Sequence, residues 1–155
     1  MIIRSVKIFL TALILSGYAN SQKNNMSVEY LSTESNDGNL TGYAPVNGLN
    51  MYFEIHGEGT PLVLIHGGGS TIQTTFGKVL NKLAENNKVI AVEMQAHGHT
   101  ADIDRPLCFE KDADDIAELL KYLKIDKANI FGFSNGASTT LQFAIRHPEL
   151  TNKII

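Results

Sequence analysis

The sequence is poor in residues that cross-link a chain. It has one cysteine, Cys108, together with four prolines and no tryptophan among 155 residues. A single cysteine cannot form an intramolecular disulfide, so stability must come from packing. We expect Cys108 to be partly buried and inert, in preference to a free thiol, a link between two chains or a catalytic group.

Neither sign of charge dominates the sequence. Lys and Arg number 13 and Asp and Glu number 16, which gives a formal net charge of −3. Proteins that bind nucleic acid usually gather Lys and Arg on one face, so we exclude nucleic acid as a partner. The hydrophobic fraction of 43% is too high for a chain that is disordered throughout, and the length suits one globular domain.

Long hydrophobic runs are scarce, and the clearest one lies near the N-terminus. Residues 8–15 are mostly apolar, with two basic residues before them and small residues after them. This order is typical of a secretory signal peptide, and the run is shorter than the ~20 apolar residues that span a bilayer. We therefore predict a signal peptide over residues 1–19, with cleavage after Ala19 or, alternatively, after Ser21. The protein is then exported to the periplasm or the medium without a stable membrane anchor; an uncleaved anchor is the competing interpretation.

The rest of the sequence divides into a polar leader and one domain. Residues 20–40 have no helical or strand periodicity and predict a flexible leader, whereas residues 41–155 alternate between strand and helix patterns. We expect a hairpin turn at Asn47-Gly48, strands over 49–56, 61–65, 88–93, 128–133 and 152–155, and helices over 71–85, 109–123 and 135–147. This order predicts an α/β fold, with a doubly wound, mostly parallel sheet behind an antiparallel hairpin.

A serine between two glycines carries the clearest chemical signal. The segment Gly132-Phe133-Ser134-Asn135-Gly136 stands between a strand pattern and a helical pattern. In a turn of this kind the serine takes a strained backbone conformation that lifts its hydroxyl clear of the sheet, and side chains two residues away on either side would collide. We therefore predict that Ser134 is a nucleophile on an elbow formed with Gly132 and Gly136; an ordinary glycine-rich loop is the alternative.

An attacking serine requires groups that stabilise the resulting oxyanion, and backbone N–H groups can do so. The first predicted donor is the amide of Asn135, which follows the serine at the start of a helix, where amides are unpaired. The second must come from another loop at the same edge of the sheet. The glycine run 67–69 directly follows a buried strand, and we choose the amide of Gly68.

Spacing argues against phosphate binding by the same glycine run. A dinucleotide fingerprint that starts at Gly67 would need its third glycine at Ile72, and a P-loop that ends at Gly77-Lys78 would need Ser or Thr at Val79. We expect no cofactor.

The remaining polar clusters predict structural roles. His97 and His99 have no obvious third ligand, so we expect no metal site. His66 ends a strand and is expected to fix the glycine run by hydrogen bonding. Four acidic residues crowd the first turns of the helix over 109–123, namely Glu110, Asp112, Asp114 and Asp115. They suit the positive end of the helix dipole, so we favour a structural role over a metal site.

Together these motifs resemble the α/β-hydrolase fold family. The segments "PLVLIHGGGS", "VIAVEMQAHGHT" and "NIFGFSNGAS" stand in family order, and the resemblance extends over residues 47–155. It implies a partial α/β-hydrolase domain over residues 41–155. The sequence departs from the family at Glu93, often Asp, at Ala96, often Gly, and at Ala137, often a second Gly. A serine nucleophile argues against a dehalogenase or epoxide-hydrolase mechanism, in which the nucleophile is a carboxylate.

The resemblance also implies two catalytic groups that this sequence does not supply. In the family the acid and the histidine follow the nucleophile on later loops, and the present sequence ends at Ile155. None of the five histidines is well placed as the base, so no catalytic acid or base is assigned. Because serine needs an adjacent base, we expect little or no turnover and interpret the sequence as the N-terminal portion of a longer hydrolase. The cause would be a truncated gene or an incomplete sequence. The exposed sheet edge would favour self-association.

The leading hypothesis is a serine hydrolase that acts on a small ester or related acyl compound through an acyl-enzyme on Ser134. Two alternatives stay open: a truncated, non-catalytic protein of the same fold, and a non-hydrolytic member such as a lyase or a peroxidase-like enzyme.

Overall fold

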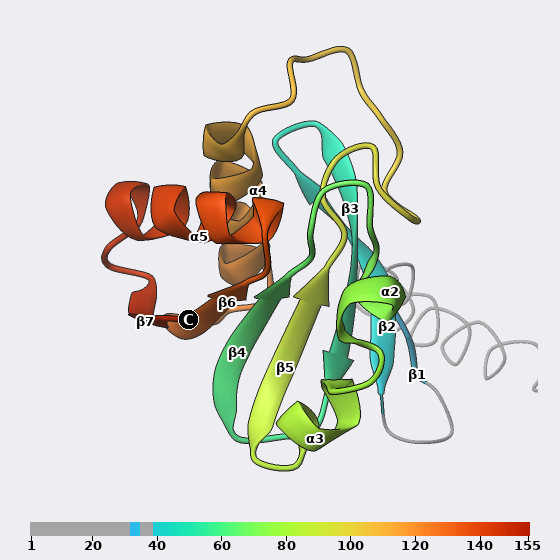
Figure 1. Ribbon diagram of the computed structural model, residues 1–155, viewed down its shortest axis with the longest axis vertical. Coiled ribbons are helices and arrows are strands. Elements are labelled where there is room, and N and C mark those ends of the chain that lie inside the picture. The colour runs from blue at the N-terminus through green and yellow to red at the C-terminus, as the bar shows by residue number, and fades with distance from the viewer. Residues whose placement is uncertain (1–31, 35–38) are drawn as a thin grey trace, which may run out of the picture. The chain divides into compact units, whose positions relative to one another are not determined.

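The computed structural model describes residues 32–34 and 39–155 (Figure 1). The predicted signal peptide and both cleavage positions lie outside these residues, as does most of the predicted leader. Within the leader, Ser32–Glu34 form strand β1. The chain divides between Ser32 and Thr33, and the fold described here is that of the unit Thr33–Ile155.

Strands and helices alternate in the predicted order. The strands are β2 (Leu40–Val46), β3 (Leu49–His56), β4 (Thr60–Ile65), β5 (Asn87–Val92), β6 (Ala128–Gly132) and β7 (Thr151–Ile154). The helices are α2 (Ile72–Phe76), α3 (Leu80–Ala84), α4 (Phe109–Tyr122) and α5 (Asn135–Arg146). The sheet has the order β1-β2-β3-β5-β4-β6-β7. Strands β4 to β7 pair in parallel and β2 and β3 pair antiparallel, which confirms a mostly parallel sheet beside a hairpin.

The hairpin turn has the conformation that its sequence predicts. Asn47 and Gly48 have φ values of 48° and 83°. Two consecutive positive φ values are the signature of the tight turn that matches the twist of antiparallel strands, and Asn-Gly adopts it readily. The turn fixes the register that places Val46 opposite Leu49.

The central strands β4 and β5 end in four consecutive buried, apolar residues each, because helices cover both faces of the sheet (Figure 1). In β4, Leu62 and Leu64 pack in the cluster formed with α2 and α3, whereas Val63 and Ile65 point to the opposite face. That face belongs to the larger cluster, to which α4 and α5 contribute. Successive side chains of a strand point to opposite faces, so both parities must be hydrophobic here.

One predicted helix is wrong: residues 71–85 form two short helices instead of one. The N–H of Gly77 bonds to the carbonyl of Gln73 and closes α2, and the Val79 N–H then bonds to the Phe76 carbonyl in a tighter turn. Glycine in a helix interior costs about 1 kcal/mol relative to alanine, so a break at Gly77 is cheap. The break lets α2 pack on β4 while α3 packs on β3 and β5. Val79, in the turn between the two short helices, is 45% exposed.

Helix α4 matches its prediction to within one residue and ends in a Schellman motif. The N–H of Ile125 bonds to the Leu120 carbonyl over 2.9 Å, and that of Lys124 bonds to the Lys121 carbonyl over 3.0 Å. The motif needs a left-handed residue after the helix, and Lys124 supplies it with a φ of 57°.

Among the described residues, no helix has the length and hydrophobicity to cross a bilayer.

Candidate active site

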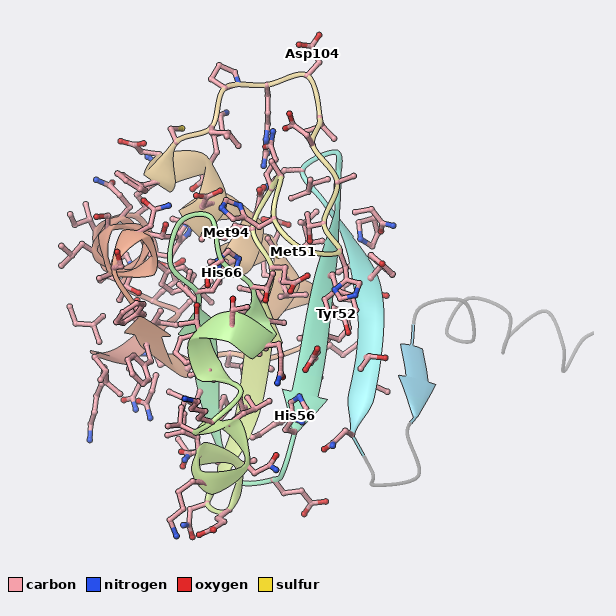
Figure 2. The ribbon with its side chains drawn as sticks, turned by 45° about the vertical axis from the view of Figure 1, so that its right-hand side comes forward. Met51, Tyr52, His56, His66, Met94 and Asp104 are labelled. Atoms are coloured by element: carbon pink, nitrogen blue, oxygen red, sulfur yellow. The ribbon has the colours of Figure 1, made fainter. Side chains whose placement is uncertain are left out.

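Three loops that matter chemically leave the sheet at the same edge. They follow β4, β5 and β6, whose carboxyl ends lie side by side because these strands are parallel neighbours. Figure 1 shows the loops after β4 and β5 rising from this edge, and in Figure 2 Asp104 lies at the outer end of the second. In open α/β sheets, ligands bind outside the carboxyl ends of the strands. The candidate site therefore lies at this edge.

Ser134 occupies the sharp turn between β6 and α5. Its φ of 53° and ψ of −114° lie in a region that residues with a side chain rarely adopt, and the residue is exposed. A Cβ atom added at Gly132 would lie 2.1 Å from the Gly136 carbonyl oxygen, and one added at Gly136 would lie 2.2 Å from that of Ile65. Neither position has room for a side chain, so the two glycines permit the turn.

The glycine loop after β4 lies directly against this turn. A Cβ atom added at Gly67 would lie 3.6 Å from the Ser134 Cβ, and one at Gly68 would lie 3.4 Å from the side chain of Asn135. Two segments that are more than sixty residues apart in the sequence therefore meet beside the serine hydroxyl.

The backbone amides of this loop differ in their hydrogen bonds. The Gly67 N–H donates to Thr75 Oγ1 over 3.4 Å, and the Gly69 N–H donates to His97 Nε2 over 3.1 Å. Within the described part of the chain, the Gly68 N–H has no acceptor. The Asn135 N–H begins α5 and has no acceptor in a preceding helical turn. Two unpaired donors are thus available beside Ser134.

His66 fixes the glycine loop, as its position at the strand end predicts. The ring is fully buried; Nδ1–H donates to the Gly67 carbonyl over 2.7 Å, and Nε2 accepts from the Met94 N–H over 3.1 Å. Figure 2 shows His66 and Met94 close together. Burial holds the pKa of His66 below its usual range, so the ring stays neutral and keeps both bonds.

His97 and His99 are also held by hydrogen bonds that position loops. His97 Nε2 accepts from Gly69, and its Nδ1–H donates to the Gln95 carbonyl over 2.8 Å. His99 Nδ1 lies 2.9 Å from the carboxylate of Glu93, which is buried at the end of β5. No group of three or more His, Cys, Asp or Glu side chains in the described residues is arranged to hold a metal ion.

All five histidines of the sequence are described, and each ring has a polar partner away from Ser134. The partners are Glu54 for His56, Gly67 for His66, Gln95 for His97, Glu93 for His99 and Asp114 for His147. Among the described residues, therefore, no histidine is hydrogen-bonded to the serine as a general base would be.

A cavity of about 360 Å³ opens next to the serine turn. It is lined by Gln95, His97, Leu107, Cys108, Phe109, Asp112 and Asn135. Asn135, which lines the cavity, directly follows Ser134 in the sequence, so the cavity adjoins the serine turn. Cys108 is of intermediate burial, as predicted, and it faces this cavity.

Asp112 lies in the first turn of α4, as its sequence position predicts, and its side chain also lines the cavity and is only 9% exposed. Burial, followed by the neighbouring charge of Asp115, raises the pKa of Asp112 to about 6. The signal was present in the sequence: position 112 is one helical turn before Ile116 and lies on the same buried stripe.

Comparison with known proteins agrees with this geometry. Residues 60–155 match the family model described as alpha/beta hydrolase fold. The human serine hydrolase BPHL is 36% identical over 118 residues, which are 71% of this chain and 40% of that protein. Proline iminopeptidase of Clostridioides difficile is 34% identical over 113 residues, or 68% and 38% of the two chains. The solved structure of the epoxide hydrolase CorEH superposes with a TM-score of 0.72 and 28% identity, covering 75% of this chain and 41% of that one. The chain thus spans about two fifths of the length of these relatives.

Proposed function

Since the chain belongs to the α/β-hydrolase fold family, we propose that it is a serine hydrolase acting on an ester or related acyl compound through an acyl-enzyme on Ser134. The backbone conformation of Ser134 carries this proposal, because a serine held at positive φ between two side-chain-free positions has its hydroxyl exposed at the loop edge. The similarity to the human serine hydrolase BPHL supports the same chemistry.

The proposed reaction uses the groups that meet at this edge. The Ser134 oxygen attacks the carbonyl carbon, its proton passes to a base, and the carbonyl oxygen becomes an oxyanion. The amides of Gly68 and Asn135, which have no other partner, donate to that oxygen. Losing one such donor typically costs about 3 kcal/mol of transition-state stabilisation. The leaving alcohol departs with a proton, and water then hydrolyses the acyl-enzyme.

The base and the acid are proposed to come from residues beyond these 155. Every histidine ring of the chain is occupied elsewhere, and the match covers only 40% of the human relative and 38% of the clostridial one. A serine without a base is a weak nucleophile. We therefore expect the 155-residue chain alone to turn over esters barely above the uncatalysed rate.

A fluorophosphonate probe tests both parts of this proposal. The protein encoded by the complete reading frame that contains these residues should be labelled stoichiometrically at Ser134. The 155-residue chain alone should react with the probe far more slowly. Ser134→Ala should abolish labelling, while Ser138→Ala in the same helix should leave it unchanged. If the protein encoded by the complete reading frame is not labelled, the alternative of a non-catalytic protein with the same fold is favoured. Rapid labelling of the 155-residue chain would contradict the inference about the missing base.

We also propose that the protein is exported by a cleaved signal peptide over residues 1–19, on the evidence of the sequence pattern alone. N-terminal sequencing of the protein from the producing cells tests this directly. A mature start at Asn20 or Gln22 is expected, and a protein retained with Met1 would contradict export.

A further inference from the structure

The cavity beside Asn135 contains a carboxylate without a partner. Asp112 is nine-tenths buried, and no hydrogen bond from any described residue reaches its side-chain oxygens. Buried polar groups are normally paired, and an unpaired charge is expensive. Among the described residues no polar side-chain atom that is sealed from solvent lacks a partner, so the Asp112 oxygens stay accessible from the cavity, where a ligand can reach them.

The charges around Asp112 do not neutralise it. The positive charge of Arg105 lowers the pKa of Asp112, but its guanidinium is hydrogen-bonded to Asp115, with Nη1 3.1 Å from Oδ1 and Nη2 close to Oδ2. Asp115 is fully buried and also accepts from Asn47 Nδ2 over 2.9 Å. One acidic group and one basic group therefore cancel, and the negative charge of Asp112 is left over.

The other groups that face Asp112 offset its charge only in part, because His97 lowers the pKa of Asp112 by less than burial and Asp115 raise it. From the loop Glu93–Cys108, the titratable His97 ring is held by its bonds to Gly69 and Gln95, and the Cys108 thiol lies on the cavity wall. From α5, the neutral side chain of Asn135 completes the lining.

We propose that this cavity binds an ammonium group of the acyl substrate, with Asp112 as its counter-ion. Assigning the bound group to the substrate rests on the proposed function, because the cavity adjoins the residue after Ser134. Leu107 and Phe109, which are 59% and 38% exposed, offer an apolar wall for the carbon stem of such an amine. A single carboxylate suits an ammonium better than a metal ion, which would need several ligands. An anionic group would be repelled.

The experiment measures binding without relying on catalysis. Ser134→Ala is titrated with benzylammonium chloride and, separately, with benzyl alcohol, which is neutral and of similar size, and binding is followed by amide chemical shifts. We expect benzylammonium to bind at least five-fold more tightly and to shift the amides of α4 near Asp112. Asp112→Asn should remove that preference. Asp114→Asn, which makes the same charge change on the outer side of α4, should retain it.

The pH dependence provides a second readout. As the pH falls through about 6, Asp112 becomes protonated and the preference for the cation should disappear, while binding of the alcohol stays constant. Equal affinity for the two ligands at pH 8, or an unchanged preference in Asp112→Asn, would overturn the proposal. Preference for the neutral alcohol would instead assign the carboxylate to a hydroxyl ligand.

This proposal and the proposed function fail separately. Benzylammonium binding reports on the cavity, whereas fluorophosphonate labelling of the protein encoded by the complete reading frame reports on Ser134. Labelling without cation preference overturns the ammonium site and leaves the hydrolase proposal standing. Cation preference without labelling overturns the hydrolase proposal and leaves a cation-binding cavity.

Discussion

At the scale of single residues, the buried carboxyl of Asp112 couples stability to pH. Its pKa is about 6 in the folded protein, against an ordinary value of 3.8. Between these two pH values the folded state holds more protons than the unfolded state, so the free energy of unfolding falls as the pH rises. The contribution is fully present below pH 3.8, is lost on passing pH 6, and amounts to roughly 3 kcal/mol.

Asp112→Asn should therefore stabilise the protein at pH 7, by roughly 1–3 kcal/mol. The gain should shrink as the pH is lowered towards 4, because the wild-type carboxyl is then protonated as well. Urea unfolding at several pH values measures this difference. Asp114→Asn should have the opposite sign and a smaller size, below about 1 kcal/mol, because the hydrogen bond from Arg146 lowers the pKa of this partly exposed carboxyl. A less stable Asp112→Asn protein at pH 7 would contradict the assignment.

Residue-level inference from the sequence worked where a residue's role follows from local geometry. The turn at Asn47-Gly48 and the tether from His66 to the glycine loop are both read from positions next to strand ends. The place of Asp112 in the cavity wall does not follow from local sequence, because its surroundings come from the loop after β5 and from α5, which are distant in the sequence. A local sequence pattern does not show whether a distant segment supplies a hydrogen-bond or charge partner for a given side chain.

At the scale of elements, the end of α4 is less stable than it could be. Lys124 is exposed and takes the left-handed conformation of the Schellman motif, which costs a residue with a Cβ atom about 1 kcal/mol or more. Lys124→Gly should raise the free energy of unfolding by about 1 kcal/mol. Lys121→Gly, in the last turn of α4, should lower it by a similar amount because glycine loses helix propensity and the exposed ion pair with Glu118 adds little. Denaturant midpoints that move in the same direction for both variants would contradict this reasoning.

The elements themselves were largely predictable because apolar periodicity and glycine spacing agree along most of the domain. Strand β4 and helix α4 follow their predicted ranges closely. The exception is residues 71–85, where the helical pattern of apolar residues continues across Gly77. This pattern does not indicate the low free-energy cost of breaking a helix at a glycine. Packing of α2 and α3 on different strands decides the outcome.

At the scale of the whole described unit, one end of the sheet is an edge strand with an exposed apolar end. Strand β7 pairs with β6 alone among the described strands, and its last residue, Ile154, is 46% exposed. On the neighbouring α5, Leu141 and Ile145 are 55% and 71% exposed. A bare strand edge beside apolar helix positions favours association with another copy or another segment.

We therefore propose that the 155-residue chain self-associates through this edge. Sedimentation velocity should show a weight-average mass that rises with protein concentration. Ile145→Lys combined with Ile154→Lys should reduce that rise, since charged residues discourage pairing at edges. Val79→Lys, an equally exposed apolar position between α2 and α3, should leave it unchanged. A monomer at all concentrations would refute the proposal.

The tethering of the glycine loop suggests a way to tune the site. Gly67 and Gly69 are held by Thr75 and His97, which belong to α2 and to the loop after β5, while Gly68 between them is left unbonded. The free amide therefore owes its direction to two side chains that are separate from the serine turn. Substitutions at Thr75 or His97 would therefore change the direction of the Gly68 N–H without altering any glycine or Ser134.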